Sequence, residues 1–343
     1  MENKKIRVAI NGFGRIGRAF LKISWDNPSI EIVAVNDLGS IESLSYLLRH
    51  DTVYRNWNHS VETKDGNLII DSKLIKFISE KDTAKLPWKD LDIDVVVEAT
   101  GLFTSFEKAK FHIDCGAKKV VISAPSKGSD GSVEGETILL GINEEKFGAT
   151  DITSNASCTT NAASPLIAIL HENLGIDKAI LNTVHGYTAS QALVDGPSKK
   201  DLREGRAAAQ NIVPSSTGAA IAVTEAFPEL KGLFDGISIR VPVPAGSIVD
   251  ITFISKKNTT KEEVNEILTK ASKDPRWEKI FAVTNEPLVS SDILGESHAS
   301  IADLEMTRVV GGNLVKVLGW YDNEMGYTYT LVDHVIKTGK TIK

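Results

Sequence analysis

The residues of this chain most able to act as a nucleophile are its two cysteines, Cys115 and Cys158. Cys158 lies within a small polar segment, Ser-Asn-Ala-Ser-Cys-Thr-Thr-Asn, and an apolar stretch typical of a helix follows over residues 162–170. An isolated cysteine is more often a buried apolar residue, but this polar setting favours a functional one. A thiol at the start of a helix faces unsatisfied N–H groups, which stabilise the thiolate and lower its pKa. We therefore predict that Cys158 is a reactive nucleophile and that Cys115, which lacks such surroundings, is structural.

A thiolate that attacks a carbonyl carbon also needs a base and a place for the oxyanion. The N–H groups at the helix start could receive the oxyanion. Among the seven histidines, His185 is the best candidate base, because it follows an apolar strand and could point into a cleft. A structural histidine is the alternative at this position, and the residues alone do not bring His185 beside Cys158.

A second motif, Gly-x-Gly-x-x-Gly, is formed by Gly12, Gly14 and Gly17. It follows a predicted strand, opens a predicted helix and precedes Asp37, which ends the next strand. The first glycine permits the turn, the second lets the backbone approach a pyrophosphate, and the helix start supplies free N–H groups. Asp37 would accept hydrogen bonds from the adenosine ribose and repel a 2′-phosphate. The motif therefore predicts a dinucleotide site that prefers NAD, against the alternative of a turn that serves only tight packing.

The order of elements around the glycine motif predicts a Rossmann-type, doubly wound parallel sheet over residues 1–157. Strand, helix and strand within about 30 residues form the βαβ unit of such a sheet. The pattern then continues with two further strands that flank a helix. The predicted strands are 5–11, 31–35, 94–99 and 119–123, and the predicted helices are 16–25 and 104–115.

Residues 158–323 predict a different domain, because strands there succeed one another mostly without helices between them. This order is typical of an α+β catalytic domain with a mixed, mainly antiparallel sheet. A C-terminal helix within about 324–343 could return to pack on the first domain. The predicted strands are 179–184, 236–243, 247–255 and 313–320, and the predicted helices are 158–173, 217–227 and 261–273.

The composition argues against several other classes of protein. A formal net charge of -6 gives no overall attraction to nucleic acid or to an anionic membrane. No run of 18 apolar residues occurs, and the N-terminus leads directly into a strand, which is unlike a signal peptide. Two cysteines are too few for a disulfide scaffold and are compatible with a reducing compartment. We expect a cytoplasmic enzyme without a metal site.

Seven segments, taken in order, resemble one known family. They are 11–18, 154–161, 196–201, 206–209, 216–220, 240–242 and 320–324. The octapeptide around Cys158 is highly specific, and the combined series is similar to the phosphorylating glyceraldehyde-3-phosphate dehydrogenases across nearly the whole chain.

The resemblance implies a mechanism that agrees with the chemistry of Cys158. Cys158 would attack the aldehyde of D-glyceraldehyde 3-phosphate to give a thiohemiacetal, with His185 accepting the thiol proton and polarising the oxygen. Oxidation by NAD would leave a thioester, and inorganic phosphate would then release 1,3-bisphosphoglycerate. It also implies a homotetramer, because the loop around residue 190 is similar to the segment that relatives use between subunits.

The resemblance further implies two anion sites and a set of cofactor contacts. Guanidinium groups, hydroxyl groups and backbone N–H groups are suitable ligands for phosphate. The substrate phosphate would be bound by Thr188 and Arg240, and the attacking phosphate by Ser157, Thr159, Arg203, Thr217 and Gly218. The implied cofactor contacts are Arg15, Ile16, Lys81 and Ser123, with Asn323 holding the carboxamide. For Arg203 a solvated surface charge and for Thr217 a helix cap are the alternatives.

The chain departs from the family pattern at three positions that bear on this chemistry. Ala162 stands where most relatives carry a second cysteine, which removes one possible disulfide on oxidation. Glu204 and Ile221 stand where many relatives carry basic residues. Both changes make the expected pocket for the attacking phosphate less positive.

Two alternative functions belong to different classes. Erythrose-4-phosphate dehydrogenase uses the same thiol and cofactor but releases an acid by hydrolysis, and the run Thr217–Ala220 resembles the phosphorylating enzyme more. Binding of RNA through the dinucleotide groove is the alternative that needs no catalysis. The acidic composition and the apparently complete catalytic set argue against RNA binding as the main role.

Overall fold

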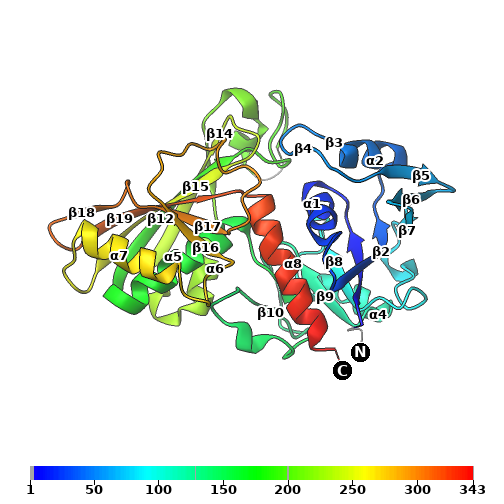
Figure 1. Ribbon diagram of the computed structural model, residues 1–343, viewed down its shortest axis with the longest axis horizontal. Coiled ribbons are helices and arrows are strands. Elements are labelled where there is room, and N and C mark those ends of the chain that lie inside the picture. The colour runs from blue at the N-terminus through cyan, green and yellow to red at the C-terminus, as the bar shows by residue number, and fades with distance from the viewer. Residues whose placement is uncertain (1–3, 128, 199–200, 343) are drawn as a thin grey trace. The chain divides into compact units, whose positions relative to one another are not determined.

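The structure is a computed structural model that describes residues 4–127, 129–198 and 201–342. Lys199 and Lys200, which belong to the predicted motif 196–201, lie outside the described residues. The chain divides into two compact units, Met1–Ala156 with Thr328–Lys343, and Ser157–Tyr327. In Figure 1 the first unit runs from blue to green and includes the red C-terminal segment. Within the described ranges, no helix combines the length and apolar character that crossing a membrane requires.

The first unit contains a nine-stranded sheet in the order β10-β11-β9-β8-β1-β2-β7-β6-β5. The seven strands from β10 to β7 run parallel, whereas β7, β6 and β5 pair antiparallel. The parallel strands are β1 (Ile6–Asn11), β2 (Ile30–Asn36), β7 (Lys73–Ile78), β8 (Val95–Glu98), β9 (Lys119–Ile122), β10 (Glu136–Thr137) and β11 (Ile152–Ser154); the remaining two are β5 (Val61–Lys64) and β6 (Asn67–Ile70). A separate pair, β3 (His50–Asp51) and β4 (Arg55–Asn56), lies outside this sheet.

The central strands of this sheet are apolar on both faces, as a parallel sheet covered by helices requires. Val8, Ile10 and Val96 are fully buried, and Trp88 packs into the same core. The helices of this unit are α1 (Arg15–Ser24), α2 (Ile41–Arg49), α3 (Phe106–Ala109) and α4 (Phe111–Asp114), with 3-10 turns η1 (Thr83–Lys85) and η2 (Glu144–Lys146). The prediction of one helix over 104–115 is wrong in this detail. Lys110 N bonds to Glu107 O, only three residues back, and this tighter turn ends α3.

The antiparallel extension β5-β6-β7 was not predicted. Its first turn is Asp65-Gly66 with φ of 50° and 74°, and its second is Asp71-Ser72 with φ of 46° and 67°. Two consecutive residues of positive φ are what a two-residue hairpin turn of the favoured twist requires. The Asp-Gly dipeptide between two short strands was therefore a signal that could have revealed the hairpin.

The second unit contains a mixed sheet in the order β13-β14-β12-β15-β19-β17-β16, with β18 also paired to β19. Two pairs, β12 with β14 and β16 with β17, are parallel, and the other pairs are antiparallel. The prediction of a Rossmann-type sheet followed by an α+β domain is confirmed. The strands are β12 (Ile176–Gly186), β13 (Val213–Ser216), β14 (Phe234–Val241), β15 (Ser247–Ser255), β16 (Phe281–Thr284), β17 (Ser300–Asp303), β18 (Arg308–Val310) and β19 (Leu314–Tyr321).

Three helices of the second unit pack against this sheet and against one another: α5 (Cys158–Leu174), α6 (Ala219–Ala226) and α7 (Lys261–Ala271). Short 3-10 turns occur at η3 (Leu202–Gly205), η4 (Ala208–Gln210) and η5 (Pro228–Leu230). Thr260 caps α7, because its Oγ1 accepts a hydrogen bond from Glu263 N at 3.2 Å.

The C-terminal helix α8 (Met325–Lys340) belongs to the first unit from Thr328 onward. His334 on α8 is fully buried, and its two ring nitrogens lie 2.8 Å from Thr153 Oγ1 and 3.1 Å from Asn155 Oδ1. These bonds fix α8 beside β11.

Candidate active site

The glycine turn between β1 and α1 has the geometry that a dinucleotide site needs. Gly12 has a φ of 96°, and a Cβ there would lie 2.6 Å from Thr100 N. A Cβ on Gly17 would lie 2.1 Å from Gly12 O, whereas a Cβ on Gly14 would meet nothing within 4 Å. Gly12 and Gly17 are thus required by packing. The open side of Gly14 leaves the backbone approachable from a neighbouring pocket.

A pocket of about 470 Å³ lies along the carboxyl ends of β1, β2 and β8. Four of the predicted cofactor residues are among those that line it: Gly12, Gly14, Asp37 and Lys81. The Asp37 carboxylate accepts hydrogen bonds from Phe13 N at 2.7 Å and from Gly39 N at 2.8 Å. Since each carboxylate oxygen can accept more than one bond, Asp37 keeps the capacity to accept ribose hydroxyls.

The other predicted cofactor residues do not line this pocket. Arg15 begins α1 and its Nη1 pairs with Asp51 Oδ2 at 2.8 Å, while Ile16 is the next residue of the helix. Ser123 Oγ donates to Glu98 O at 3.0 Å. Asn323 belongs to the second unit, where its Oδ1 accepts bonds from Gly246 N and Ser247 Oγ.

Several polar residues that the sequence did not single out lie at or beneath the pocket. Asn11 and Asn36 line it, and each directly precedes a predicted cofactor residue. Behind them, Glu98 and His112 form a buried ion pair or hydrogen bond at 3.0 Å. Asn11, Asn36 and Glu98 become neighbours through the pairing of adjacent strands, and His112 reaches Glu98 from α4.

Cys158 is the first residue of α5, as predicted. Ser157 caps the helix, because its Oγ accepts a hydrogen bond from Thr160 N at 3.0 Å. The Cys158 Sγ lies 3.4 Å from His185 Nε2, so the fold brings the predicted nucleophile and the predicted base together. This distance is within the reach of a sulfur hydrogen bond.

The strand register explains why a guanidinium lies beside His185. His185 on β12 is the register partner of Arg240 on the parallel strand β14. Arg240 Nη1 lies 2.6 Å from His185 Nδ1, and Gly186 O also lies 2.6 Å from Nδ1. Arginine can only donate and a carbonyl can only accept, so these two contacts require opposite tautomers of His185.

Burial is the largest cause of the pKa shifts of Cys158 and His185. It lowers the pKa of His185 to about 3, with the Arg240 charge as the second cause. It raises the pKa of the Cys158 thiol, against the smaller opposing effects of Arg240 and of the N–H groups at the helix start. The N–H groups at the helix start lower the pKa of Cys158 as expected, but burial outweighs their effect. Both shifts favour the neutral thiol and the neutral imidazole.

Tyr321, which was not among the predicted site residues, contacts His185 and the residue after Cys158. Its buried hydroxyl lies 2.9 Å from Thr159 Oγ1 and 2.8 Å from Thr183 Oγ1. Its ring meets the His185 ring edge-on at 5.9 Å. Thr159 and the base-bearing strand β12 are thus tied to one residue of β19.

Two residues near His185 retain polar atoms that could bind an anion. Of the residues that the structure describes, none satisfies the buried Nε of Arg240 or the buried Nε2 of Gln191. Gln191 Oε1 accepts a bond from the N–H of Thr188 at 3.4 Å, and the Thr188 hydroxyl lies 3.1 Å from Ser190 Oγ. Arg240 and Thr188 were predicted to hold the substrate phosphate.

The residues predicted for the second anion lie on other elements. Arg203, on η3, is exposed and its Nε pairs with Asp201 at 3.1 Å. Gly218 precedes α6 and offers no capping side chain, while Thr217 Oγ1 accepts a bond from Ala219 N at 3.2 Å. Ser157 and Thr159 use their hydroxyls in the bonds to Thr160 and Tyr321 given above.

The two departures that concern the expected pocket for the attacking phosphate, Glu204 and Ile221, have different surroundings. Glu204 accepts a bond from Ser215 Oγ at 3.0 Å and so links η3 to β13. Ile221 on α6 is 60% exposed. Glu204 therefore has a structural partner, and nothing in the structure explains Ile221.

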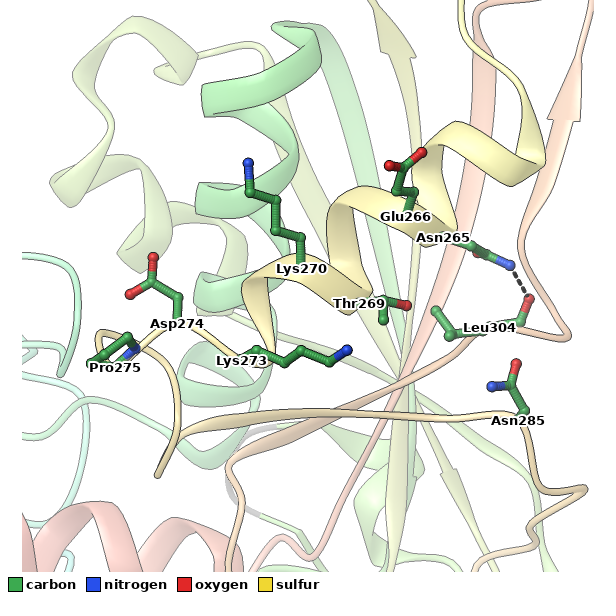
Figure 2. A pocket seen from close by; sticks show the side chains of 9 residues that line it. All are labelled: Asn265, Glu266, Thr269, Lys270, Lys273, Asp274, Pro275, Asn285 and Leu304. Atoms are coloured by element: carbon green, nitrogen blue, oxygen red, sulfur yellow. Dashed lines mark hydrogen bonds between the residues drawn. The ribbon is translucent and has the colours of Figure 1, made fainter.

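A larger hollow of about 780 Å³ lies elsewhere in the second unit, along α7 (Figure 2). Lys270, Lys273 and Glu266 line it, and Asn265 Nδ2 donates to Leu304 O at 2.8 Å. It contains no thiol or histidine. Across the described ranges, no cluster of three His, Cys, Asp or Glu side chains could hold a metal ion.

Comparisons with known proteins agree with the division into two functional parts. Residues 6–106 match the family model of the glyceraldehyde 3-phosphate dehydrogenase NAD binding domain, and residues 157–323 match that of the C-terminal domain. The chain is 47% identical over 335 residues to a glyceraldehyde-3-phosphate dehydrogenase of Borreliella burgdorferi, covering 96% of this chain and 98% of the relative. It is 46% identical to glyceraldehyde-3-phosphate dehydrogenase 1 of a Nostoc species, covering 96% and 95%. A Streptomyces coelicolor relative of the same name is 45% identical, covering 98% and 99%.

Proposed function

The chain belongs to the glyceraldehyde-3-phosphate dehydrogenase family, whose members are NAD-dependent oxidoreductases, and we propose that Cys158 and His185 carry its chemistry. The observation that supports this assignment best is the 3.4 Å distance between Cys158 Sγ and His185 Nε2 at the start of α5. The substrate is glyceraldehyde 3-phosphate. The proposed product is 1,3-bisphosphoglycerate.

The first step is attack of the Cys158 sulfur on the aldehyde carbon. The thiol proton moves to His185 Nε2 while the new S–C bond forms, which gives a thiohemiacetal. A neutral imidazole is the form that can accept this proton, and the lowered pKa of His185 keeps it neutral at physiological pH. The N–H groups at the start of α5 stabilise the oxygen that gains negative charge.

Arg240 couples substrate binding to this proton transfer. His185 can accept a proton at Nε2 and become imidazolium only if Nδ1 carries its own proton, which Gly186 O would accept at 2.6 Å. Arg240 Nη1 occupies the same place in the protein alone. A substrate phosphate that draws Arg240 away from Nδ1, with Thr188 as a second ligand, would therefore release His185 to act as a base.

The cofactor residues of the first unit fit a dinucleotide. Gly14 is open toward the pocket, α1 begins without a capping side chain, and Asp37 retains acceptor capacity for a ribose. Gly12, Gly14, Arg15, Ile16 and Gly17 would hold the pyrophosphate end, and Lys81, Ser123 and Asn323 would contact the rest. When bound, NAD supplies the oxidant for the thiohemiacetal carbon, which becomes a thioester on Cys158.

Inorganic phosphate would complete the reaction by attacking the thioester carbon. The new C–O bond gives the acyl phosphate, and the sulfur leaves as thiolate and recovers a proton. Arg203, Thr217 and Gly218 would bind this phosphate together with Ser157 and Thr159. Arg203 is free to reorient because its pairing with Asp201 is solvent-exposed.

We further propose two domains, a cytoplasmic location and a homotetramer. The NAD-binding domain would comprise 1–157 with the helix at 324–343, and the catalytic domain 158–323. One face of the sheet in the second unit exposes the apolar side chains of Ile180, Ile237 and Leu314. Together with exposed apolar residues in the loop around residue 190, this face supports assembly of identical copies. Leu193 and Val194 in that loop are 79% and 72% exposed.

A steady-state assay tests the proposed chemistry. Glyceraldehyde 3-phosphate and erythrose 4-phosphate are each supplied with NAD or NADP, with and without phosphate or arsenate. We expect sustained NADH formation from glyceraldehyde 3-phosphate only when phosphate or arsenate is present. Equal turnover without either anion, or a preference for erythrose 4-phosphate, would contradict the phosphorylating assignment.

The Cys158→Ser variant provides the control. It should lose at least a thousandfold in turnover while binding NAD as the wild type does, because Cys158 is not part of the dinucleotide pocket. Cys115→Ser should keep activity, since Cys115 Sγ donates only to Thr83 O at 3.1 Å. Retained activity in Cys158→Ser would overturn the mechanism.

A further inference from the structure

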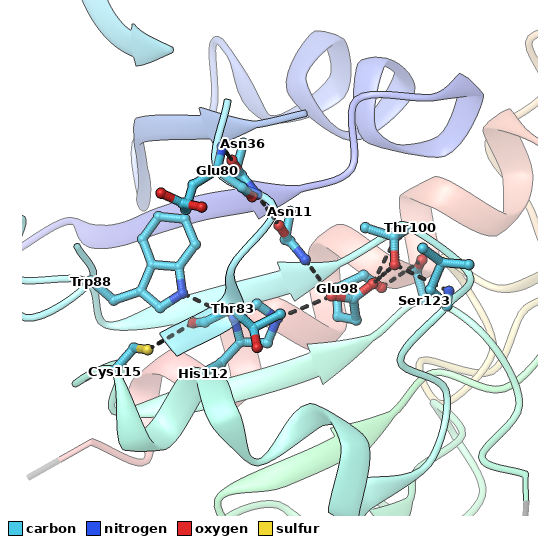
Figure 3. Close-up of polar contacts among 11 residues, drawn as sticks. Asn11, Asn36, Glu80, Thr83, Trp88, Glu98, Thr100, His112, Cys115 and Ser123 are labelled. Carbon is cyan, nitrogen blue, oxygen red and sulfur yellow. Dashed lines mark hydrogen bonds and ion pairs between the residues drawn. The ribbon is translucent and has the colours of Figure 1, made fainter. Parts of the chain in front are cut away.

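A row of three polar side chains crosses the sheet of the first unit at its carboxyl edge. Asn36, Asn11 and Glu98 are the last residues of β2, β1 and β8, and the strand register places them side by side. Asn36 Nδ2 donates to Asn11 Oδ1 at 2.8 Å, and Asn11 Nδ2 donates to Glu98 Oε2 at 2.6 Å. Figure 3 shows the three side chains linked in this order.

The Glu98 carboxylate is almost completely buried and is surrounded by donors. Oε1 accepts bonds from the N–H of Thr100 at 2.8 Å and from the Thr100 hydroxyl. Oε2 accepts the bond from Asn11 and faces His112 Nε2 at 3.0 Å. A group that meets only donors is suited to the ionised carboxylate, which has no proton to give.

Trp88 fixes the tautomer of His112. The indole Nε1–H lies 2.9 Å from His112 Nδ1 and can only donate, so Nδ1 has no proton and Nε2 carries it. Nε2–H therefore donates to Glu98 Oε2. Burial also lowers the pKa of His112, which favours this neutral form. Because each group in the chain Trp88–His112–Glu98 has one possible role, the orientation of the carboxylate is determined (Figure 3).

Each member of the row is followed by a segment that lines the dinucleotide pocket. Gly12 follows Asn11, Asp37 follows Asn36, and Ala99 with Thr100 follows Glu98. The Thr100 backbone also packs against Gly12, where a Cβ would approach Thr100 N to 2.6 Å. The bonds from Thr100 to Glu98 thus set the position of the segment that closes on the glycine turn.

We propose that Glu98 and His112 are positioning residues for the NAD site, acting through Asn11 and Thr100 without touching the cofactor. Neither residue lines the pocket. Their hydrogen bonds hold three strand ends in the relative positions that dinucleotide binding needs. Loss of those bonds should weaken NAD binding and leave the Cys158–His185 pair, which belongs to the other unit, unchanged.

Two replacements of His112 separate this role from simple packing. Gln can donate to Glu98 and accept from Trp88, whereas Phe keeps the ring and volume but makes neither bond. A packing role in this apolar core would favour Phe. The proposal predicts the opposite order: His112→Gln within about threefold of the wild-type Kd for NAD, and His112→Phe weakened about tenfold or more. The Kd is measured by calorimetric titration of the full chain with NAD.

The Glu98→Gln variant tests the carboxylate itself, because the amide nitrogen would replace one oxygen and so face two of the four donors. We expect NAD binding to weaken about tenfold or more, with the KM for NAD raised, and the KM for glyceraldehyde 3-phosphate and kcat within about twofold. His334→Gln is the matched control, since His334 is also a fully buried histidine of the first unit but lies away from the pocket. Thermal unfolding is recorded for each variant.

The outcomes decide the proposal. Weaker NAD binding in Glu98→Gln and His112→Phe, but not in His112→Gln or in a similarly destabilised His334→Gln, supports it. Unchanged NAD affinity in folded Glu98→Gln overturns it. An order in which His112→Phe binds as the wild type and His112→Gln does not would also overturn it. None of these measurements depends on the assignment of Cys158.

Discussion

In the proposed mechanism, the contact between Arg240 and His185 restrains the base until substrate binds. The guanidinium and the Gly186 carbonyl both lie 2.6 Å from His185 Nδ1, but a single tautomer cannot satisfy both. The positive charge of Arg240 also lowers the pKa of His185, second only to burial. Arg240 thus lowers the pKa of the base through its charge. Its buried Nε has no hydrogen-bond partner among the described residues and could bind an anion.

Replacement of Arg240 by Gln should reveal both effects. With the charge gone, the pKa of His185 rises and the acid limb of the pH profile for kcat/KM moves to higher pH. The KM for glyceraldehyde 3-phosphate should rise about tenfold or more, as expected for loss of a charge-assisted bond. The profile is recorded from pH 4 to 9 with saturating NAD; the acid limb of the wild type, at a pKa of about 3, lies below this range, and that of the variant should enter it. Arg203→Gln is the control, because its exposed side chain pairs with Asp201 instead; an equal displacement of the acid limb there would contradict the coupling.

At the scale of single residues, the sequence indicated which residues belong to the candidate site better than it indicated the direction of their pKa shifts. Cys158 could be found because its polar neighbours and the following helix are local, but the direction of its pKa could not, because burial depends on the whole domain. Glu98 and His112 are 14 residues apart, and Trp88 is 24 residues from His112. Their association depends on how α4 and the segment around Trp88 pack beside β8, which no local pattern displays.

Among the elements, α8 and β11 are joined by a buried histidine whose protonation opposes folding. Burial lowers the pKa of His334 to about 3 from an ordinary value of 6.5. Between these values the unfolded chain binds more protons than the folded chain, so stability is present above pH 6.5 and is lost as pH falls toward 3. The loss is at most about 1.4 kcal/mol per pH unit for this one group.

His334→Gln should therefore flatten the dependence of stability on pH. Gln retains a donor and an acceptor for Thr153 and Asn155, and it cannot take up the proton. The denaturant midpoint of the variant should fall less between pH 6.5 and 5 than that of the wild type, although it starts lower at pH 7. His50→Gln, which replaces an exposed histidine, serves as the control. A variant with the full wild-type slope would show that His334 does not contribute.

The elements themselves were predictable where periodicity and flanking residues agreed. The parallel strands β1, β2, β8 and β9 are rich in apolar residues, and α5 and α7 begin at recognisable caps. The hairpin β5-β6-β7 was missed, because its strands are short and partly exposed, although Asp65-Gly66 indicated the turn. The pairing of β12 with β14, which brings Arg240 to His185, is parallel and non-local and could not be read from the chain.

At the scale of the whole molecule, one face of the sheet in the second unit exposes apolar side chains that the chain itself does not cover. Along β15 buried and half-buried residues alternate strictly, so one face is covered and the other is not. The open face carries apolar side chains that are prominently exposed: Ile180 at 59%, Ile237 at 51% and Leu314 at 41%. Asn182 Oδ1, on the same side of β12 as Ile180, has no hydrogen-bond partner among the described residues. A second copy of the chain that covers this face would bury the apolar side chains and could satisfy the amide.

A charge placed on this face should disrupt the proposed tetramer. In Ile237→Glu the carboxylate would be desolvated against apolar partners, a cost that a subunit interface does not tolerate without a paired cation. Light scattering after gel filtration should give about four times the 37.2 kDa chain mass for the wild type and a smaller assembly for the variant. Lys270→Glu on α7, which is exposed outside this face, should leave the mass unchanged. A wild type that elutes as a monomer contradicts the tetramer, and an intact tetramer of Ile237→Glu excludes this face as its interface.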